Sequence, residues 1–192
     1  MKFIQHQAFL LLIILFTMGC RQITKDRSNY YFDSINGNDA NTGTEPFNAF
    51  RSLSKIKKLD VQPGDSILLK SGAIFTEKLY FSGKGEFNKP IVIGKYGGDI
   101  KPHIKGDATH FEMVHIFNSE HIVVRDLEIS NKGNASVPGL KGLLVQLREY
   151  RQAVNTTIDN LYIHDVYGGV EIEKGGGIAL CIQNAIDRKS VV

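Results

Sequence analysis

Tryptophan is absent from this 192-residue chain, and cysteine and proline are scarce, with two and five residues. Two cysteines cannot form the several disulfides of a disulfide-rich domain. Heptad repeats and long helical apolar stripes are also missing, which excludes coiled coils and helical bundles. The formal net charge is only +3, and no basic stripe interleaved with aromatic residues occurs. We therefore expect no nucleic-acid partner.

Residues 1–19 have the layout of an export signal. Lys2 precedes the apolar run Ala8–Phe16, which is too short for a transmembrane helix, and Gly19-Cys20 follows. The segment resembles a bacterial lipoprotein signal, in which the cysteine after a small residue is acylated. We predict lipidation of Cys20, a linker over residues 20–29, and a location at the bacterial cell surface or in the periplasm, anchored to the membrane, with plain secretion as the alternative.

One helix is expected within residues 30–65, after a strand and a turn-rich loop. Pro46 suits the start of a helix because its φ angle is fixed and it lacks a donor. An apolar residue then recurs at every third position, at Phe50, Leu53, Ile56 and Leu59. We predict that this helix caps the end of the domain that follows.

Residues 66–186 contain short β-branched apolar segments separated by Gly, Asn, Asp and Lys. This pattern predicts strands joined by turns, and the lack of helical segments between them excludes a βαβ fold. Two stretches repeat: His121–Ser130 aligns with Asn155–His164 at an offset of 34, and Gly142–Leu147 aligns with Gly177–Ile182 at an offset of 35. We therefore predict an all-β fold, a parallel β-helix built of stacked coils.

Asn and Asp residues are predicted to shape two kinds of turn. Residues 34–44 are rich in side chains that could ligate Ca²⁺, but their spacing does not match an EF-hand and an ordinary turn is favoured. Asp126 and Asn160 occupy equivalent corners between predicted strands, where they can bond to the backbone.

From Tyr30 to Asn184 the chain resembles the right-handed parallel β-helix proteins of the pectate-lyase-like class, in the segments Tyr30–Phe32, Asn36–Asp39, Pro63–Leu69, Lys89–Ile93 and Tyr162–Val166. The resemblance implies a right-handed helix and a surface-anchored polysaccharide-degrading protein. It favours a polysaccharide lyase acting on uronic-acid-containing glycans. The alternatives are a glycoside hydrolase, or a non-catalytic glycan-binding or structural β-helix surface protein.

A lyase of that class needs carboxylates and a cation that project from one sheet. The densest such cluster is His164, Asp165, Glu171, Glu173 and Lys174. Glu171 and Glu173 would share one strand face and are the candidate metal ligands, with Ca²⁺ as the ion. His164, Asp165 and Lys174 are the catalytic candidates, with a solvated outer face followed by a turn as the alternative. The spacing of the remaining histidines after the signal, His103, His110, His115 and His121, predicts no metal site.

The pattern of coils stops soon after Gly177, and residues 187–192 depart from it. A solenoid needs a cap at each end. We expect residues 187–192 to be foreign sequence, the active centre to lie partly or wholly beyond residue 186, and the chain by itself to be inactive.

Overall fold

The computed structural model describes residues 27–135, 137–148 and 155–167, together with the strand backbone at 179–182, 185–186 and 190–191. This part of the chain is mostly β-strand, with two short 3₁₀ helices, η1 (Pro46–Asn48) and η2 (Leu53–Lys58). No helix in it is long and apolar enough to cross a membrane. The strands are β1 (Asn29–Phe32), β2 (Ser66–Lys70), β3 (Ile74–Phe75), β4 (Leu79–Phe81), β5 (Ile91–Tyr96), β6 (His103–Gly106), β7 (Glu112–Phe117), β8 (Ile122–Arg125), β9 (Glu128–Asn131), β10 (Lys141–Gln146), β11 (Thr156–Asp159), β12 (Tyr162–Val166), β13 (Ala179–Ile182), β14 (Ala185–Ile186) and β15 (Ser190–Val191).

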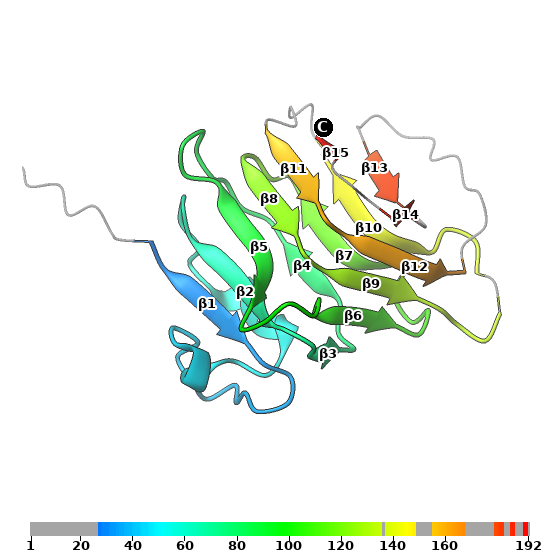
Figure 1. The fold of residues 1–192 in the computed structure, drawn as a ribbon. Coiled ribbons are helices and arrows are strands. Elements are labelled where there is room, and N and C mark those ends of the chain that lie inside the picture. Colours follow the sequence, from blue (N-terminus) through cyan, green and yellow to red (C-terminus); the bar gives the residue numbers. More distant parts are fainter. Residues whose placement is uncertain are drawn as a thin grey trace, which may run out of the picture.

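The strands form three sheets. Sheet 1 has the order β1-β2-β5-β8-β11-β15, sheet 2 the order β4-β7-β10-β13 and sheet 3 the order β3-β6-β9-β12-β14. Strands β1 to β12 pair in parallel, whereas β13, β14 and β15 pair antiparallel with their neighbours. From β2 to β13 the chain visits sheet 1, sheet 3 and sheet 2 in turn, whereas β14 returns to sheet 3 and β15 to sheet 1 (Figure 1). The all-β class and the parallel strands are therefore as predicted.

The strand register confirms the first of the two predicted sequence alignments. Thr156 pairs with Ile122 and Tyr162 with Glu128, which confirms the offset of 34. The second alignment implied that β13 runs parallel to β10, and this is wrong: Gln146 pairs with Ala179 in an antiparallel ladder. The inward and outward alternation of a strand has a period of two in either direction, so the sequence pattern does not encode strand polarity.

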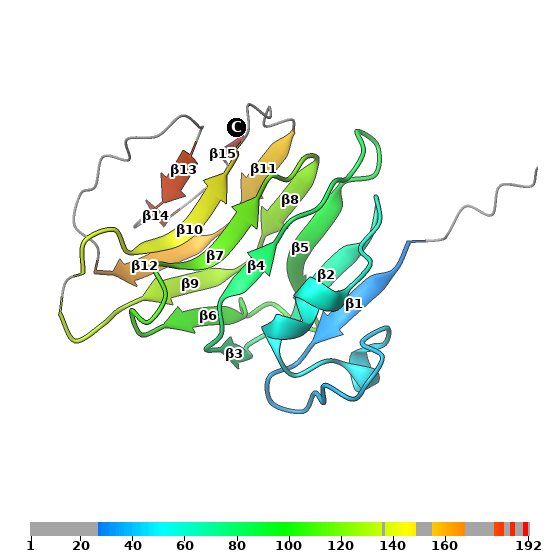
Figure 2. The same ribbon diagram turned by 180° about the vertical axis from the view of Figure 1, so that it is seen from behind.

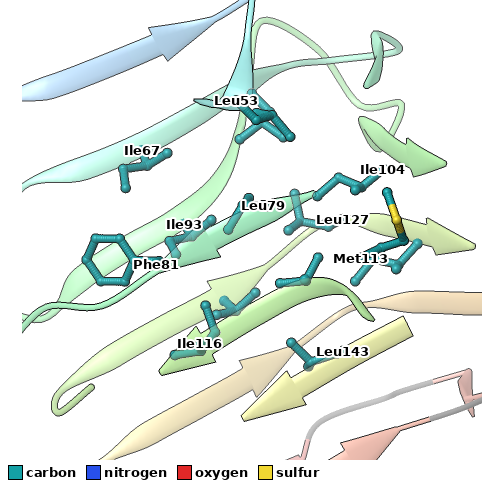
Figure 3. Packing of buried hydrophobic residues seen from close by; sticks show 14 of the residues in the cluster. Leu53, Ile67, Leu79, Phe81, Ile93, Ile104, Met113, Ile116, Leu127 and Leu143 are labelled. Atoms are coloured by element: carbon teal, nitrogen blue, oxygen red, sulfur yellow. The ribbon is translucent and has the colours of Figure 1, made fainter. Parts of the chain in front are cut away.

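The core consists of apolar ladders on the inner faces of the sheets (Figure 3). In sheet 3, Ile104 pairs with Ile129 and Ile129 with Ile163, and each is at most 2% exposed. The other ladders are Ile67, Ile93, Val124 and Ile158 in sheet 1, and Leu79, Val114 and Leu143 in sheet 2, all fully buried. Because like residues stack in parallel register, each round buries its apolar side chains against its neighbours.

The predicted α-helix is instead two separate 3₁₀ helices. A 3₁₀ helix has three residues per turn, so an apolar residue at every third position forms one straight stripe, which explains the spacing. Leu53 and Ile56 of η2 are buried, and η2 packs against β4 (Figure 2). Phe50 precedes η2 and forms an isolated bridge with Phe32. Three of the four predicted apolar positions, Phe50, Leu53 and Ile56, are thus buried and Leu59 is partly buried, although the helix type differs.

Left-handed backbone marks the corners between sheets 1 and 3. Asp126 and Asn160 have φ angles of 59° and 50°, conformations that Asx residues tolerate. The Asn160 amide donates to Asp126 Oδ1 at 2.6 Å, so the two corners are bonded to each other. Both residues thus lie at the predicted corners, but their side chains bond to each other, not to the backbone as predicted.

The carboxylates of Asp33 and Asp39 accept hydrogen bonds from backbone amides in and beside the loop at residues 34–44. Asp33 Oδ1 accepts hydrogen bonds from the backbone amides of Ile35 and Asn36, at 2.9 and 3.0 Å. Asp39 Oδ1 accepts from the amides of Arg51 and Ser52, each at 2.9 Å. These bonds to the protein's own backbone are what the turn interpretation predicts.

Candidate functional site

The outer face of sheet 3 carries the densest group of chemically active side chains in the described part of the chain. Since Ile104, Ile129 and Ile163 point inward, the residues that alternate with them point outward. The outward residues are His103 and Lys105 on β6, Glu128 and Ser130 on β9, and Tyr162 and His164 on β12. Parallel register brings them side by side.

We define the histidine cluster as His103, Glu128, Ser130, His164 and Asp165. His164 Nε2 lies 3.0 Å from Glu128 Oε1, and its Nδ1 lies 3.1 Å from Asp165 Oδ2. His103 Nε2 lies 2.8 Å from Ser130 Oγ, and its Nδ1 lies 3.5 Å from the same Glu128 Oε1. Glu128 thus stands between two imidazoles.

Asp165 reaches His164 because of a local irregularity in β12. The register shifts between His164 and Val166, which pair with Ser130 and Asn131. Asp165 occupies the extra position with a φ of 48°. A bulge of this kind redirects a side chain, and here it places two successive residues on one site.

Burial lowers the pKa of His103 below its ordinary value, and the positive charge of Lys105 and the neighbouring His164 act in the same direction. The carboxylate of Glu128 opposes this shift. A lowered pKa favours the neutral form of the His103 ring, in which one ring nitrogen carries a lone pair.

Tyr162 extends the site with an aromatic surface. Its ring stacks on His164 with centroids 4.4 Å apart and planes inclined by 20°. The residue is 40% exposed, so part of the ring faces solvent. The cluster can therefore offer carboxylate, imidazole and aromatic groups to a ligand.

A pocket of about 470 Å³ lies between η2, the segment after it and the end of β4. It is lined by Ile56, Lys57, Leu59, Asp60, Val61, Tyr80, Phe81 and Ser82. The ammonium group of Lys57 lies 5.4 Å from the centroid of the Tyr80 ring. The walls of this pocket combine apolar side chains with polar groups that can fix the orientation of a small ligand.

The outer face of sheet 2 continues from this pocket. The Tyr80 ring lies 5.4 Å from that of His115, edge to face, and 6.4 Å from that of Phe117. Glu112 accepts hydrogen bonds from Lys78 and from His115 Nδ1. Burial raises the pKa of Glu112, but these bonds and the charge of Lys78 outweigh it and lower the pKa to about 2.

The structure tests only some of the predicted site residues. His164 and Asp165 do lie together, on the outer face of sheet 3. Glu171, Glu173 and Lys174, like Cys20 and the export signal, lie outside the described residues. Their proposed catalytic, metal-binding and lipidation roles stay predictions.

Sequence reasoning missed His103, Glu128 and Ser130. Spacing along the chain predicted no metal site at His103, and it could not reveal that β6 pairs with β9 and brings His103 beside Glu128. The offset of 34 would have placed Glu128 and Ser130 opposite Tyr162 and His164. His103 lies only 25 residues before Glu128, so the repeat did not reveal it.

No protein-family model matches the chain. Lacto-N-biosidase of Bifidobacterium longum subsp. longum is 28% identical over 77% of this chain, which spans only 12% of that protein. Two crystal structures of a GH136 lacto-N-biosidase from Eubacterium ramulus also match. The selenomethionine form is 31% identical with a TM-score of 0.63 over 77% of this chain and 28% of that one. The native form is 32% identical with a TM-score of 0.57 over 73% and 27%.

These relatives correct the family and the activity that were predicted from the sequence. The pectate-lyase-like resemblance and the lyase activity that it implied are wrong, since the similar proteins are glycoside hydrolases. Stacked parallel strands with Asx and Gly turns produce similar sequence patterns whatever chemistry the fold carries, so the pattern does not distinguish a lyase from a hydrolase. The predicted alternative of a glycoside hydrolase agrees with the comparisons: the chain is similar to part of the GH136 lacto-N-biosidases.

Proposed function

We propose that the protein functions in glycoside hydrolysis, cleaving a lacto-N-biosidic linkage in a glycan. The observation that carries this proposal is 31% identity with a TM-score of 0.63 to a GH136 lacto-N-biosidase over 77% of the chain. The chain spans about 28% of that relative. Because the chain corresponds to only part of that relative, its hydrolase activity is proposed for this protein by similarity.

The test is an activity assay on the protein read from its own locus to the natural stop codon. We expect release of a disaccharide from a chromogenic lacto-N-bioside, with one oxygen of the product derived from ¹⁸O-labelled water. Hydrolysis adds water across the glycosidic bond, whereas a lyase leaves an unsaturated sugar that absorbs ultraviolet light. An unsaturated product, or no turnover of any glycan offered, would contradict the proposal.

We also infer that the successive rounds of the chain are coils of a right-handed parallel β-helix, with the three sheets as its faces, and that η2 covers the core of its first coil. Support comes from the strand order, in which parallel neighbours are separated by a visit to each of the other sheets. Parallel crossover connections are almost always right-handed, because of the right-handed twist of the strands. A crystal structure in which the rounds progress with left-handed rotation would contradict this inference.

A second candidate function is glycan binding without hydrolysis, and the pocket beside Tyr80 favours it. A volume of about 470 Å³ suits a small saccharide. Tyr80 offers an aromatic ring, while Lys57, Asp60 and Ser82 offer polar contacts to hydroxyl groups. Binding without turnover would favour this second candidate.

Variants of the pocket test this role by calorimetry with lacto-N-biose or a longer oligosaccharide. We expect Tyr80→Ala to weaken binding roughly tenfold, since stacking and desolvation at a hot-spot aromatic residue are worth about 1–2 kcal/mol. Phe47→Ala is the control, because Phe47 is 81% exposed and outside the pocket. Equal affinities of the two variants would exclude the pocket as the binding site.

A further inference from the structure

We propose that His103, Glu128 and His164 form a binding site for one divalent transition-metal ion, with Zn²⁺ as the preferred metal. Each residue offers one ligand atom, and these atoms all lie within 4.8 Å of one another. Its ligands are not Glu171 and Glu173, the residues predicted from the sequence to bind Ca²⁺. It does not depend on the proposed hydrolase activity.

The distances within the cluster suit a tetrahedral ion. Zinc bonds of ~2.0–2.1 Å place tetrahedral ligand atoms ~3.3 Å apart. Glu128 Oε1 lies 3.0 Å from His164 Nε2 and 3.5 Å from His103 Nδ1, on either side of that value. An ion bound by Glu128 and either histidine would therefore require only small movements of those atoms, and the two imidazoles, whose ligand nitrogens lie within 4.8 Å of each other, would close on it.

The ring nitrogens that face away from this centre are already held. His103 Nε2 contacts Ser130 Oγ at 2.8 Å, and His164 Nδ1 contacts Asp165 Oδ2 at 3.1 Å. Metal-binding histidines characteristically bond through the second nitrogen to a carboxylate or another polar group, which fixes the tautomer and the ring plane. Both imidazoles of the cluster have this arrangement, and the bulge at Asp165 provides one of the two partners.

The type of ligand decides the class of metal. Two imidazoles and one carboxylate suit Zn²⁺ and its neighbours in the first transition series, whereas Ca²⁺ and Mg²⁺ prefer sets made wholly of oxygen. The side chains of His103, Glu128 and His164 are 17%, 28% and 25% exposed. Three protein ligands at a partly open surface leave a fourth position for water or a sugar hydroxyl.

The site would join three rounds of the chain. Its ligands come from β6, β9 and β12, which are adjacent in sheet 3 but separated in sequence by whole rounds. A bound ion would therefore restrain the outer face of sheet 3 by adding a link between strands that already meet through backbone ladders, apolar packing and the side-chain contacts of the histidine cluster.

Titration of the chelator-treated full chain with Zn²⁺, followed by calorimetry, tests the proposal. We expect one ion per chain, and a Co²⁺ complex with the intense visible absorption of a four-coordinate site. The double variant His103→Ala/His164→Ala should abolish both signals. His110→Ala is the matched control, because His110 is exposed and outside the cluster, and it should bind as the wild type does.

Three further variants separate coordination from a general structural effect. Glu128→Gln keeps the shape of the side chain but loses the carboxylate, so it should lose affinity while circular dichroism stays unchanged. Asp165→Asn keeps a residue that tolerates the φ of 48° but loses the carboxylate that contacts His164, so it should weaken binding about tenfold. Lys105→Gln removes a positive charge from the same face and should tighten binding.

The outcomes that overturn the proposal are specific. Zn²⁺ affinity that is equal in the wild type and the double variant would place binding elsewhere, and preference for Ca²⁺ over Zn²⁺ would exclude the ligand set. If the wild-type protein did not hydrolyse glycans, the proposed function would be wrong, but the metal-binding proposal would still stand. The two proposals therefore fail by different measurements.

Discussion

His164 Nε2 lies 3.0 Å from Glu128 Oε1, although the two residues are 36 positions apart in the sequence. They are held by neighbouring parallel strands, in which Tyr162 pairs with Glu128 and His164 with Ser130. The contact is thus diagonal across the ladder, and it is made by two partly buried side chains. The order of the strands, and not proximity in the chain, assembles the histidine cluster.

This contact should contribute measurably to stability in the absence of metal. A double-mutant cycle with Glu128→Gln and His164→Asn, run in chelator, should give a coupling free energy of ~0.5–1.5 kcal/mol. The control pair is Lys84 and Glu120, which lie 3.1 Å apart with Lys84 57% exposed. Exposed pairs contribute less, so that cycle should give below ~0.5 kcal/mol. Equal couplings would show that partial burial adds nothing.

Glu112 should make the protein sensitive to acid. Its pKa is lowered to about 2 from an ordinary value of 4.5, so the stability that it adds is fully present above pH 4.5 and is lost as the pH falls toward 2. Glu112→Gln should lower the free energy of unfolding at pH 7 by ~2 kcal/mol and flatten its pH dependence below pH 4.5. Urea unfolding across this range is the measurement.

The control for that experiment is Glu86→Gln, since Glu86 is exposed. Its unfolding profile should follow that of the wild type. If Glu112→Gln kept the full acid dependence, other carboxylates would have to account for it.

The inner ladder of sheet 3 should dominate the stability of this region. Ile129 is fully buried between Ile104 and Ile163, so Ile129→Ala removes apolar contacts on both sides and leaves a cavity. We expect a loss of ~2–5 kcal/mol in the free energy of unfolding. Ile74→Ala is the control, because Ile74 is 53% exposed, and it should cost less than ~1 kcal/mol. Similar losses would contradict the ladder as the core.

The corner at Asp126 should discriminate between side chains by backbone conformation. With φ at 59°, an alanine there is strained by ~1–2 kcal/mol, while glycine is not. We expect Asp126→Ala to destabilise more than Asp126→Gly. Asp126→Asn should be tolerated best, because it keeps an oxygen for the Asn160 amide. Thermal unfolding of the three variants gives the order, and a reversed order would exclude strain as the cause.

The sequence predicted the elements that depend on local patterns. Alternation in segments such as Ile122–Arg125 indicated strands, and the offset of 34 correctly aligned β8 and β9 with β11 and β12. Residues at every third position identified the buried side of η2, although they did not distinguish a 3₁₀ from an α-helix. The pattern could not predict that β13 runs antiparallel to β10, since the alternation of inward and outward residues is the same in both strand directions.

The sequence by itself thus determined that the protein is all-β and where its apolar ladders point, and it singled out His164 and Asp165 as candidate site residues. Only the tertiary structure decided which outward side chains meet. The rounds differ in length, so His103 pairs with Glu128 across 25 residues and Glu128 with Tyr162 across 34. Local physics fixes which face a side chain takes, but the register between rounds of unequal length is set by packing of the whole core. The histidine cluster therefore exists only once the sheets are stacked.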